Sequence, residues 1–158
     1  MRFRVLAAAA LLAVCSAMSA AAQAPASAGC TLEKGYYYCN RAAFRSALKA
    51  ARTAAVESPY MDQAGVNALS SLTQELGKTQ ATKPAEPADL TFVLTRPEPE
   101  AVFFGPRGRD LAFINIYARG PVGSRGPLIW NETFYGQEGM PWAIVVHQLI
   151  QQFKESIK

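Results

Sequence analysis

The fold is decided by residues 110–158, which read DLAFINIYAR-GPVGSRG-PLIWNETFY-GQEGM-PWAIVVHQLIQQFKESIK. In the last part of this stretch, apolar side chains recur at intervals of three and four residues, the period of one helix face. They are Trp142, Val145, Val146, Leu149, Ile150, Phe153 and Ile157. Pro141 stands where a first helical residue is expected, and a proline loses no hydrogen bond there. An isolated helix of this length is marginal in water, so its apolar side must be buried.

Two strands precede this helix. Residues 111–119 alternate between two sets of side chains, as successive residues of a strand do. Residues 127–135 are rich in β-branched and aromatic side chains, which favour strands. The glycine-rich segment 120–126 lies between them and predicts a β-hairpin with a long, flexible loop. A sheet with one face covered by the C-terminal helix would bury both apolar patterns together.

The N-terminal segment resembles a secretory signal peptide covering residues 1–22. Arg2 and Arg4 form its charged start, an apolar run follows, and Ala20 to Ala22 supply small residues for cleavage. The apolar run is too short for a mature membrane anchor, and no later stretch approaches that length. We therefore expect a periplasmic or secreted protein without a transmembrane helix in the mature chain. One alternative is an uncleaved N-terminal anchor. The other is an outer-membrane-anchored lipoprotein modified at Cys15 or Cys30.

The net charge argues against nucleic acid as a partner. The chain carries 16 basic and 12 acidic side chains, a formal charge of +4. Removing the leader removes two arginines and no acids, which leaves 14 basic and 12 acidic side chains, or +2. This mild excess is far from the strongly basic surface of nucleic-acid-binding proteins.

Cys30 and Cys39 are the only cysteines after the leader. Two cysteines in an exported protein most simply form one disulfide. The loop between them is short, so the stabilisation is on the order of 2–3 kcal/mol. The alternatives are a redox pair, which favours two intervening residues, and a metal site, which needs more ligands than this chain offers. We assign residues 23–39 to a linker and this disulfide loop, and residues 40–158 to a single domain.

The loop between the cysteines contains three consecutive tyrosines, at positions 36–38. The simpler interpretation is that one or two of them pack on the edge of the domain. The alternative is an exposed aromatic ridge that binds a partner.

The first half of the domain predicts two helices and two strands. Asn40 is a good N-cap for a helix that carries Phe44 and Leu48 on its buried face. Residues 52–58 are compatible with the end of this helix or with a first strand. A second helix is expected to begin at Asp62 and to end at Gly77 with a left-handed cap. Residues 79–88 read as a loop, and residues 89–95 as a strand with Leu90, Phe92 and Leu94 facing inward.

Residues 96–109, RPEPEAVFFGPRGR, do not fit a regular element, because proline disfavours a central strand. Phe103 and Phe104 either fold back over the edge of the sheet or form an exposed apolar tip for a partner. Arg107 and Arg109 precede the strand that begins at Leu111, while Arg119 and Arg125 follow its end. A strand of nine residues is about 30 Å long, so we expect four solvated loop charges and not one anion site.

With residues 52–58 taken as a strand, the order becomes strand, helix, three strands, helix, in an α/β (α+β) domain. The helices lie on one face of a mixed sheet, and a disulfide loop and a short helix come first. This order resembles small periplasmic α/β domains of unknown function in bacterial envelope proteins, similar to the TolB amino-terminal domain and the curli-secretion lipoprotein family. The resemblance spans about residues 50–157. It is carried by RTAAVES at 52–58, the helix end at Leu76-Gly77-Lys78, Ala88-Asp89-Leu90 opening a strand, and Gly126-Pro127-Leu128-Ile129-Trp130.

The resemblance implies a non-catalytic protein that binds envelope partners, and it supplies no catalytic residues. The sequence contains no GxSxG elbow, phosphate loop, HExxH pair or calcium loop. The single histidine, His147, is expected to be a half-buried packing residue on the last helix. Glu132 on the neighbouring strand is the one acid that could pair with it in a general acid–base role. We expect no cofactor and no metal.

We therefore expect an uncharacterised binding or assembly factor of the bacterial envelope that is not an enzyme. Its partner is an envelope protein or a cell-wall component, and its oligomeric state is not specified by the sequence. The predicted partner surface comprises Phe103, Phe104, Arg107, Arg109 and Trp130, together with the loop at 120–126. The alternative is a hydrolase of envelope polymers that uses His147 and Glu132.

Overall fold

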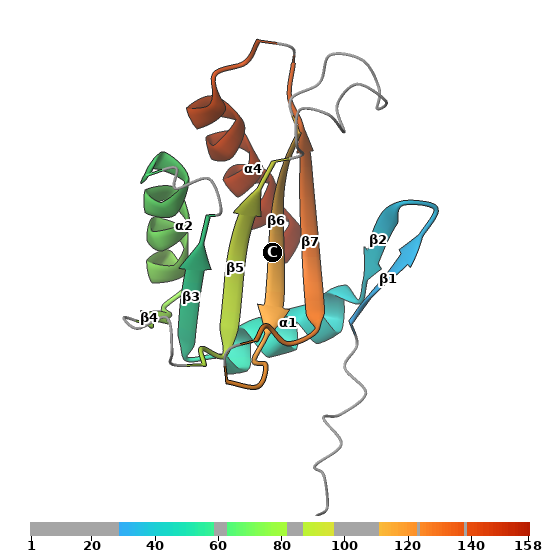
Figure 1. Ribbon diagram of the computed structural model, residues 1–158, viewed down its shortest axis with the longest axis vertical. Coiled ribbons are helices and arrows are strands. Elements are labelled where there is room, and N and C mark those ends of the chain that lie inside the picture. The colour runs from blue at the N-terminus through green and yellow to red at the C-terminus, as the bar shows by residue number, and fades with distance from the viewer. Residues whose placement is uncertain (1–28, 59–62, 82–86, 97–110, 123, 138) are drawn as a thin grey trace, which may run out of the picture.

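The computed structural model describes residues 29–58, 63–81, 87–96 and 111–158, apart from positions 123 and 138 (Figure 1). The elements in chain order are β1 (Cys30–Glu33), β2 (Tyr36–Cys39), α1 (Arg41–Ala50), β3 (Thr53–Glu57), α2 (Gln63–Glu75), β4 (Thr79–Gln80), β5 (Leu90–Thr95), β6 (Leu111–Ala118), β7 (Leu128–Tyr135) and α4 (Trp142–Ile157). The signal segment and residues 97–110 lie outside the described residues.

The described strands form a separate hairpin, β1–β2, and a five-stranded mixed sheet in the order β4-β3-β5-β6-β7. Strand β3 pairs in parallel with β4 and β5, whereas β5, β6 and β7 are antiparallel to one another. The predicted α/β domain with a mixed sheet is confirmed. The expected loop at 79–88 was wrong at its start, because Thr79 and Gln80 form the short edge strand β4.

Residues 53–57 are a strand, which resolves the ambiguity of this segment. The helix before it ends because Ala51 adopts an extended conformation. Strand β3 then lies between β4 and β5, and the side chain of Ala54 is fully buried. A small side chain suits this position, because the packed core leaves little space beneath it.

Local signals set the ends of the first two helices. The side chain of Asn40 accepts a hydrogen bond of 3.0 Å from the backbone N–H of Ala43, which confirms the predicted N-cap. Gly77 has a φ of 68°, and the N–H groups of Gly77 and Lys78 bond to the carbonyls of Gln74 and Thr73. This is a Schellman cap, in which glycine tolerates the left-handed backbone. It turns the chain so that the Thr79 N–H reaches the Arg52 carbonyl and pairs β4 with β3.

The core lies between one face of the sheet and the helices, which are seen behind the sheet in Figure 1. The predicted apolar stripe of α4 is buried at Val145, Val146, Leu149, Ile150 and Phe153. Four aromatic rings join the layers. Phe44 stacks on Trp130 with ring centroids 4.7 Å apart, and Phe153 makes edge contacts with Phe44 at 6.1 Å and with Phe92 at 6.4 Å.

Backbone hydrogen bonds join the two ends of the β6–β7 loop, and the expected flexibility of this loop stays a prediction. The Gly126 N–H donates to the Ala118 carbonyl at 3.2 Å, and the Ala118 N–H donates to the Pro127 carbonyl at 3.0 Å. A Cβ atom on Gly126 would lie 2.4 Å from the Ala118 carbonyl oxygen. A Cβ atom on Gly120 would lie 2.5 Å from the backbone of Arg125. The glycines are required because the two sides of the loop approach each other this closely.

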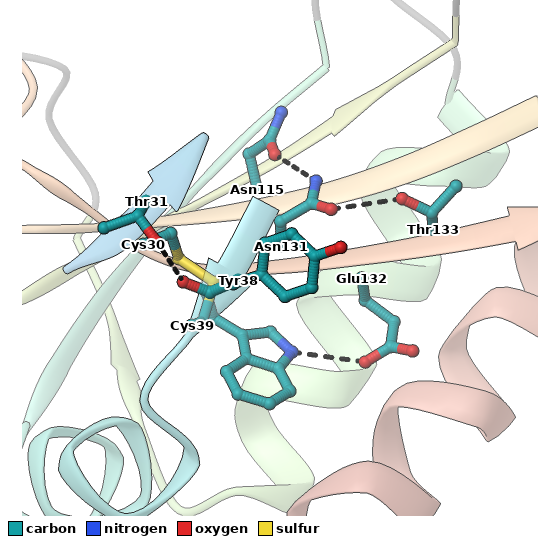
Figure 2. Close-up of a disulfide and its surroundings, with 9 residues drawn as sticks. Cys30, Thr31, Tyr38, Cys39, Asn115, Asn131, Glu132 and Thr133 are labelled. Carbon is teal, nitrogen blue, oxygen red and sulfur yellow. Dashed lines mark hydrogen bonds between the residues drawn. A yellow bond between two sulfur atoms is a disulfide. The ribbon is translucent and has the colours of Figure 1, made fainter. Parts of the chain in front are cut away.

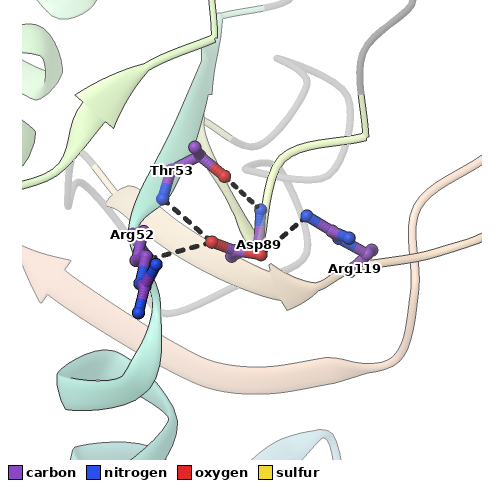
Figure 3. Close-up of polar contacts among 4 residues, drawn as sticks. All are labelled: Arg52, Thr53, Asp89 and Arg119. Carbon is purple, nitrogen blue, oxygen red and sulfur yellow. Dashed lines mark hydrogen bonds and ion pairs between the residues drawn. The ribbon is translucent and has the colours of Figure 1, made fainter.

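Asp89 connects the starts of β3 and β5 with the end of β6 (Figure 3). One carboxylate oxygen accepts from the backbone N–H groups of Arg52 at 2.9 Å and Thr53 at 3.0 Å. The other oxygen pairs with the Arg119 guanidinium at 2.8 Å. The Asp89 N–H in turn donates to the Thr53 hydroxyl at 2.9 Å. The Arg119 side chain was expected to be a solvated loop charge; it is 56% exposed, and it is also paired with Asp89.

The first prediction concerns Gly126. We expect Gly126→Ala to lower the free energy of unfolding by about 1–3 kcal/mol, because the added methyl group collides with backbone atoms that cannot move independently. Urea denaturation followed by circular dichroism measures the change. Gly35→Ala is an informative control, since a Cβ atom there meets nothing within 4 Å although the backbone φ of 84° is strained. A smaller loss for Gly126→Ala than for Gly35→Ala would contradict the steric argument.

The second prediction concerns pH. The backbone N–H groups of Arg52 and Thr53, followed by Arg119, hold the pKa of Asp89 below its ordinary value of 3.8. A carboxyl whose pKa is lower in the folded state stabilises the fold above its unfolded pKa, and this contribution disappears as the pH falls through the folded pKa. We expect Asp89→Asn to cost about 1–2 kcal/mol at pH 7. Urea titrations near pH 7 and again well below pH 3.8 should show this difference shrinking in acid. An unchanged difference would contradict the assignment.

Candidate functional site

The structure does not bring His147 and Glu132 together. The two carboxylate oxygens of Glu132 accept from Trp130 Nε1 at 3.2 Å and from Gln152 Nε2 at 2.5 Å. Gln152 and His147 are five residues apart on α4, which is about 140° around the helix axis. His147 is exposed and was wrongly expected to be half-buried. The pairing on which the hydrolase alternative depended is therefore not formed.

His147 instead lines a groove between α2 and α4, with a cavity volume of about 330 Å³. The floor is apolar and consists of Leu72, Val146 and Ile150. An ion pair of 2.5 Å between Glu75 and Lys154 lies at the end of the groove where both helices finish. The opposite charges of this pair cancel, so the groove carries no charged group suited to orienting an ionic substrate.

The described part of the chain offers no metal centre. Within it, no group of three histidine, cysteine, aspartate or glutamate side chains is placed to hold a metal ion. Within the same residues, no helix is both long and apolar enough to cross a membrane.

The residues predicted to form the partner surface fall into two groups. Phe103, Phe104, Arg107 and Arg109 fall within 97–110, outside the residues that the structure describes. Trp130 is described, and only 6% of its surface is exposed. It is stacked on Phe44 and held by Glu132, so its assignment to the partner surface is corrected to a core position.

The sequence allowed two interpretations of the three tyrosines at positions 36–38. The structure places these tyrosines on an exposed hairpin. Exposure is 61% for Tyr36, 45% for Tyr37 and 57% for Tyr38, and the neighbouring Leu32 is 62% exposed. The simpler interpretation, that they pack on the domain edge, does not describe these side chains. The hairpin projects from the sheet beside β7 (Figure 1).

The Cys30–Cys39 disulfide joins the two strands of this hairpin at its base, as predicted (Figure 2). The two cysteines are direct partners across the strands, and Thr31 pairs with Tyr38 next to them. Leu32 pairs with Tyr37 on one face, and Glu33 pairs with Tyr36 on the other, so both faces carry tyrosine. Because the Cys30 thiol is consumed in this bond, Cys30 is not available for lipidation in the oxidised protein.

The outer edge of β7 has features that hinder pairing with a strand of another molecule. Among the described strands β7 is the last of the sheet, so one row of its backbone groups lacks a neighbouring strand. The Gln152 amide donates to the Thr133 carbonyl at 2.9 Å. Glu132 places a charge on the same strand, and the hairpin packs against β7. A charged side chain and a covering element are ordinary ways to protect a sheet edge.

The second face of the sheet carries side chains that the sequence analysis did not single out. Asn131 Nδ2 donates to Asn115 Oδ1 at 2.7 Å, and the Thr133 hydroxyl donates to Asn131 Oδ1 at 3.1 Å. The sequence signal that could have identified this pair was the position of Asn115 and Asn131 inside strands, where asparagine is uncommon. The contact itself joins residues sixteen positions apart and depends on the β6–β7 register.

Arg125 lies across this same face. Its guanidinium carbon is 5.4 Å from the centre of the Tyr117 ring, and the group forms an ion pair with Glu57 on β3. The arginine was expected to be a solvated loop charge; it is exposed, and it is also paired with Glu57. The pair ties the compact β6–β7 loop to the sheet.

No family model, curated protein or solved structure matches this chain.

The third prediction concerns the disulfide. We expect Cys30→Ser with Cys39→Ser to accelerate backbone hydrogen exchange at Leu32 and Tyr37 while β5 and β6 remain protected. The reason is that a lone two-stranded hairpin is only marginally stable, and the crosslink restricts its open states. Hydrogen exchange read by mass spectrometry on oxidised wild type and on the variant makes the comparison. Equal loss of protection in the hairpin and in β5 would mean that the crosslink stabilises the whole domain.

Proposed function

We propose that this chain is a non-catalytic binding or assembly factor of the bacterial envelope that recognises a protein partner through its tyrosine hairpin, residues 30–39. The observation that carries the proposal is the exposure of Leu32, Tyr36, Tyr37 and Tyr38 on one disulfide-closed element. The disulfide and the expected export signal both support an oxidising compartment outside the cytoplasm.

Tyrosine is well suited to this role. Its ring supplies a large contact area with only two rotatable bonds, and its hydroxyl can bond at a wet interface. A hairpin closed by a disulfide loses little further conformational freedom on binding, so less of the contact energy is offset by ordering. The hairpin leaves these four side chains outside the core cluster, and only Cys39 packs against it.

The size of the contact follows from the exposed area. Three half-exposed tyrosines offer about 300 Å² together, if an aromatic side chain buries about 150–250 Å² in full. A standard interface buries about 800 Å² on each partner. The hairpin thus supplies the central anchors, and the rim lies on the neighbouring surface of β7, against which the hairpin packs.

The fourth prediction tests the hairpin as the partner surface. Mature protein with its disulfide intact is cross-linked in native envelopes, the dominant partner is identified by mass spectrometry, and the affinity of the purified pair is measured by calorimetry. We expect Tyr36→Ser with Tyr37→Ser to weaken binding by at least about 30-fold, because one central tyrosine alone contributes about 2 kcal/mol or more.

The matched control is Val122→Ser with Ile144→Ser, which removes two other exposed apolar side chains, 80% and 46% exposed. This control should bind as wild type does. If the control loses affinity and the tyrosine variant does not, the partner surface lies elsewhere. If neither variant affects any envelope interaction, the protein-binding proposal is wrong.

A further inference from the structure

The sheet has a second face that no described helix covers. Side chains that point to it are absent from the core cluster, whereas their neighbours in sequence belong to that cluster. Strand registers place these outward positions side by side across β5, β6 and β7. They are Thr91, Val93, Thr95, Phe113, Asn115, Tyr117, Asn131 and Thr133, and all except Val93 are partly exposed.

The centre of this face is a directed chain of hydrogen bonds. Thr133 donates to Asn131, and Asn131 donates to Asn115. The Asn115 amide nitrogen has two N–H groups, and no described residue accepts a hydrogen bond from it. The chain therefore ends in a donor, while its other end is a hydroxyl oxygen that can still accept. Successive bonds polarise one another, which strengthens both free ends toward a ligand.

Aromatic rings border the amides. Phe113 and Tyr117 are two residues before and after Asn115 on β6, so their Cα atoms are about 13 Å apart along the strand. Thr95 pairs with Phe113, and Thr91 pairs with Tyr117, which adds a hydroxyl beside each ring. Tyr135 follows Thr133 on the same face of β7 and is 45% exposed. The face thus alternates flat apolar surfaces with uncharged donors and acceptors.

The charges on this face cancel. Its acid and base are Glu57 and Arg125, and they are paired with each other while Arg125 also covers the Tyr117 ring. A polyanion or a charged membrane surface would find no unpaired opposite charge among these described residues. An uncharged polymer would lose no ionic hydration on binding here. The face is complementary to a ligand that is neutral, rich in hydroxyl or amide groups, and flat on its apolar sides.

We infer that this open sheet face binds an uncharged sugar chain that carries acetamido groups. The amides of Asn115 and Asn131 exchange hydrogen bonds with hydroxyl and acetamido groups. Phe113 and Tyr135 receive the C–H faces of the sugar rings, while Arg125 lies over the Tyr117 ring. The site adjoins the tyrosine hairpin, which packs against β7 (Figure 2), but it does not rest on the protein-binding proposal.

The test uses the mature chain with its disulfide intact and the β-1,4-linked hexamer of N-acetylglucosamine. The fully deacetylated hexamer has the same backbone with positive charges in place of acetamido groups, and it is the ligand control. Nitrogen-15 NMR follows the side-chain amides during titration. We expect saturable shifts at Asn115 and Asn131 with the acetylated hexamer, and much smaller shifts with the deacetylated one.

Two variants test whether the hexamer binds at the open sheet face. Asn131→Ser, which removes the central amide, should weaken binding by about tenfold or more. Asn67→Ser makes the same change on α2, where the Asn67 side chain accepts from Gln63 and bonds to no other described side chain, and it should bind as wild type does. The wild-type titration decides the question even if Asn131→Ser fails to fold. Absence of saturable shifts at millimolar hexamer overturns the inference. Shifts confined to Tyr36–Cys39, or preferential binding of an uncharged extended peptide to the face, overturn it as well.

Discussion

The contact of Phe153 with Phe44 and Phe92 is the interaction on which the rest of the structure depends. It joins α4 to α1 on one side and to the centre of the sheet on the other. Trp130 extends the same cluster to β7 by stacking on Phe44. Large aromatic rings bury much apolar surface at a few positions, which matters in a domain with a small core. Two helices, α1 and α4, meet in this cluster, and α2 joins the same core through Leu69 and Leu72.

That one-sided arrangement explains why the two faces of the sheet differ in chemistry. The helix side is filled by side chains such as Leu94, Ile114 and Ile116, none of which is exposed. The other side must satisfy its own polar groups, and it does so with the Asn115–Asn131 amide pair and the Glu57–Arg125 ion pair. An antiparallel sheet with one packed and one wet face commonly alternates in this way. The polar face is therefore a consequence of the fold that remains available for binding.

The hairpin at residues 30–39 is held in order by a disulfide and not by a packed core. Its strands are four residues each, and most of its large side chains point away from the core. The disulfide replaces the core as its source of order, since a small ribbon cannot bury enough apolar surface for itself. Rigidity and exposure are combined in this element, and both favour recognition of a partner over support of the domain.

Much of the fold could be predicted from local patterns. The stripe of α4, the alternation of β5 and β6, the Asn40 cap and the Gly77 turn each depend on residues within a few positions of one another. The disulfide followed from the number of cysteines after the expected leader. These features were predictable because short-range periodicity and backbone preferences act before any long-range contact forms.

The sequence by itself thus determined the class of the fold, the main elements and the covalent link. Only the tertiary structure decided that residues 53–57 form a strand, because its start is held by the carboxylate of Asp89, 36 residues away. It also decided that Trp130 is buried, that His147 and Glu132 lie on opposite flanks of α4, and that two asparagines meet across β6 and β7. These outcomes depend on strand register and helix rotation, which are set by packing of the whole core and leave no local trace in the chain.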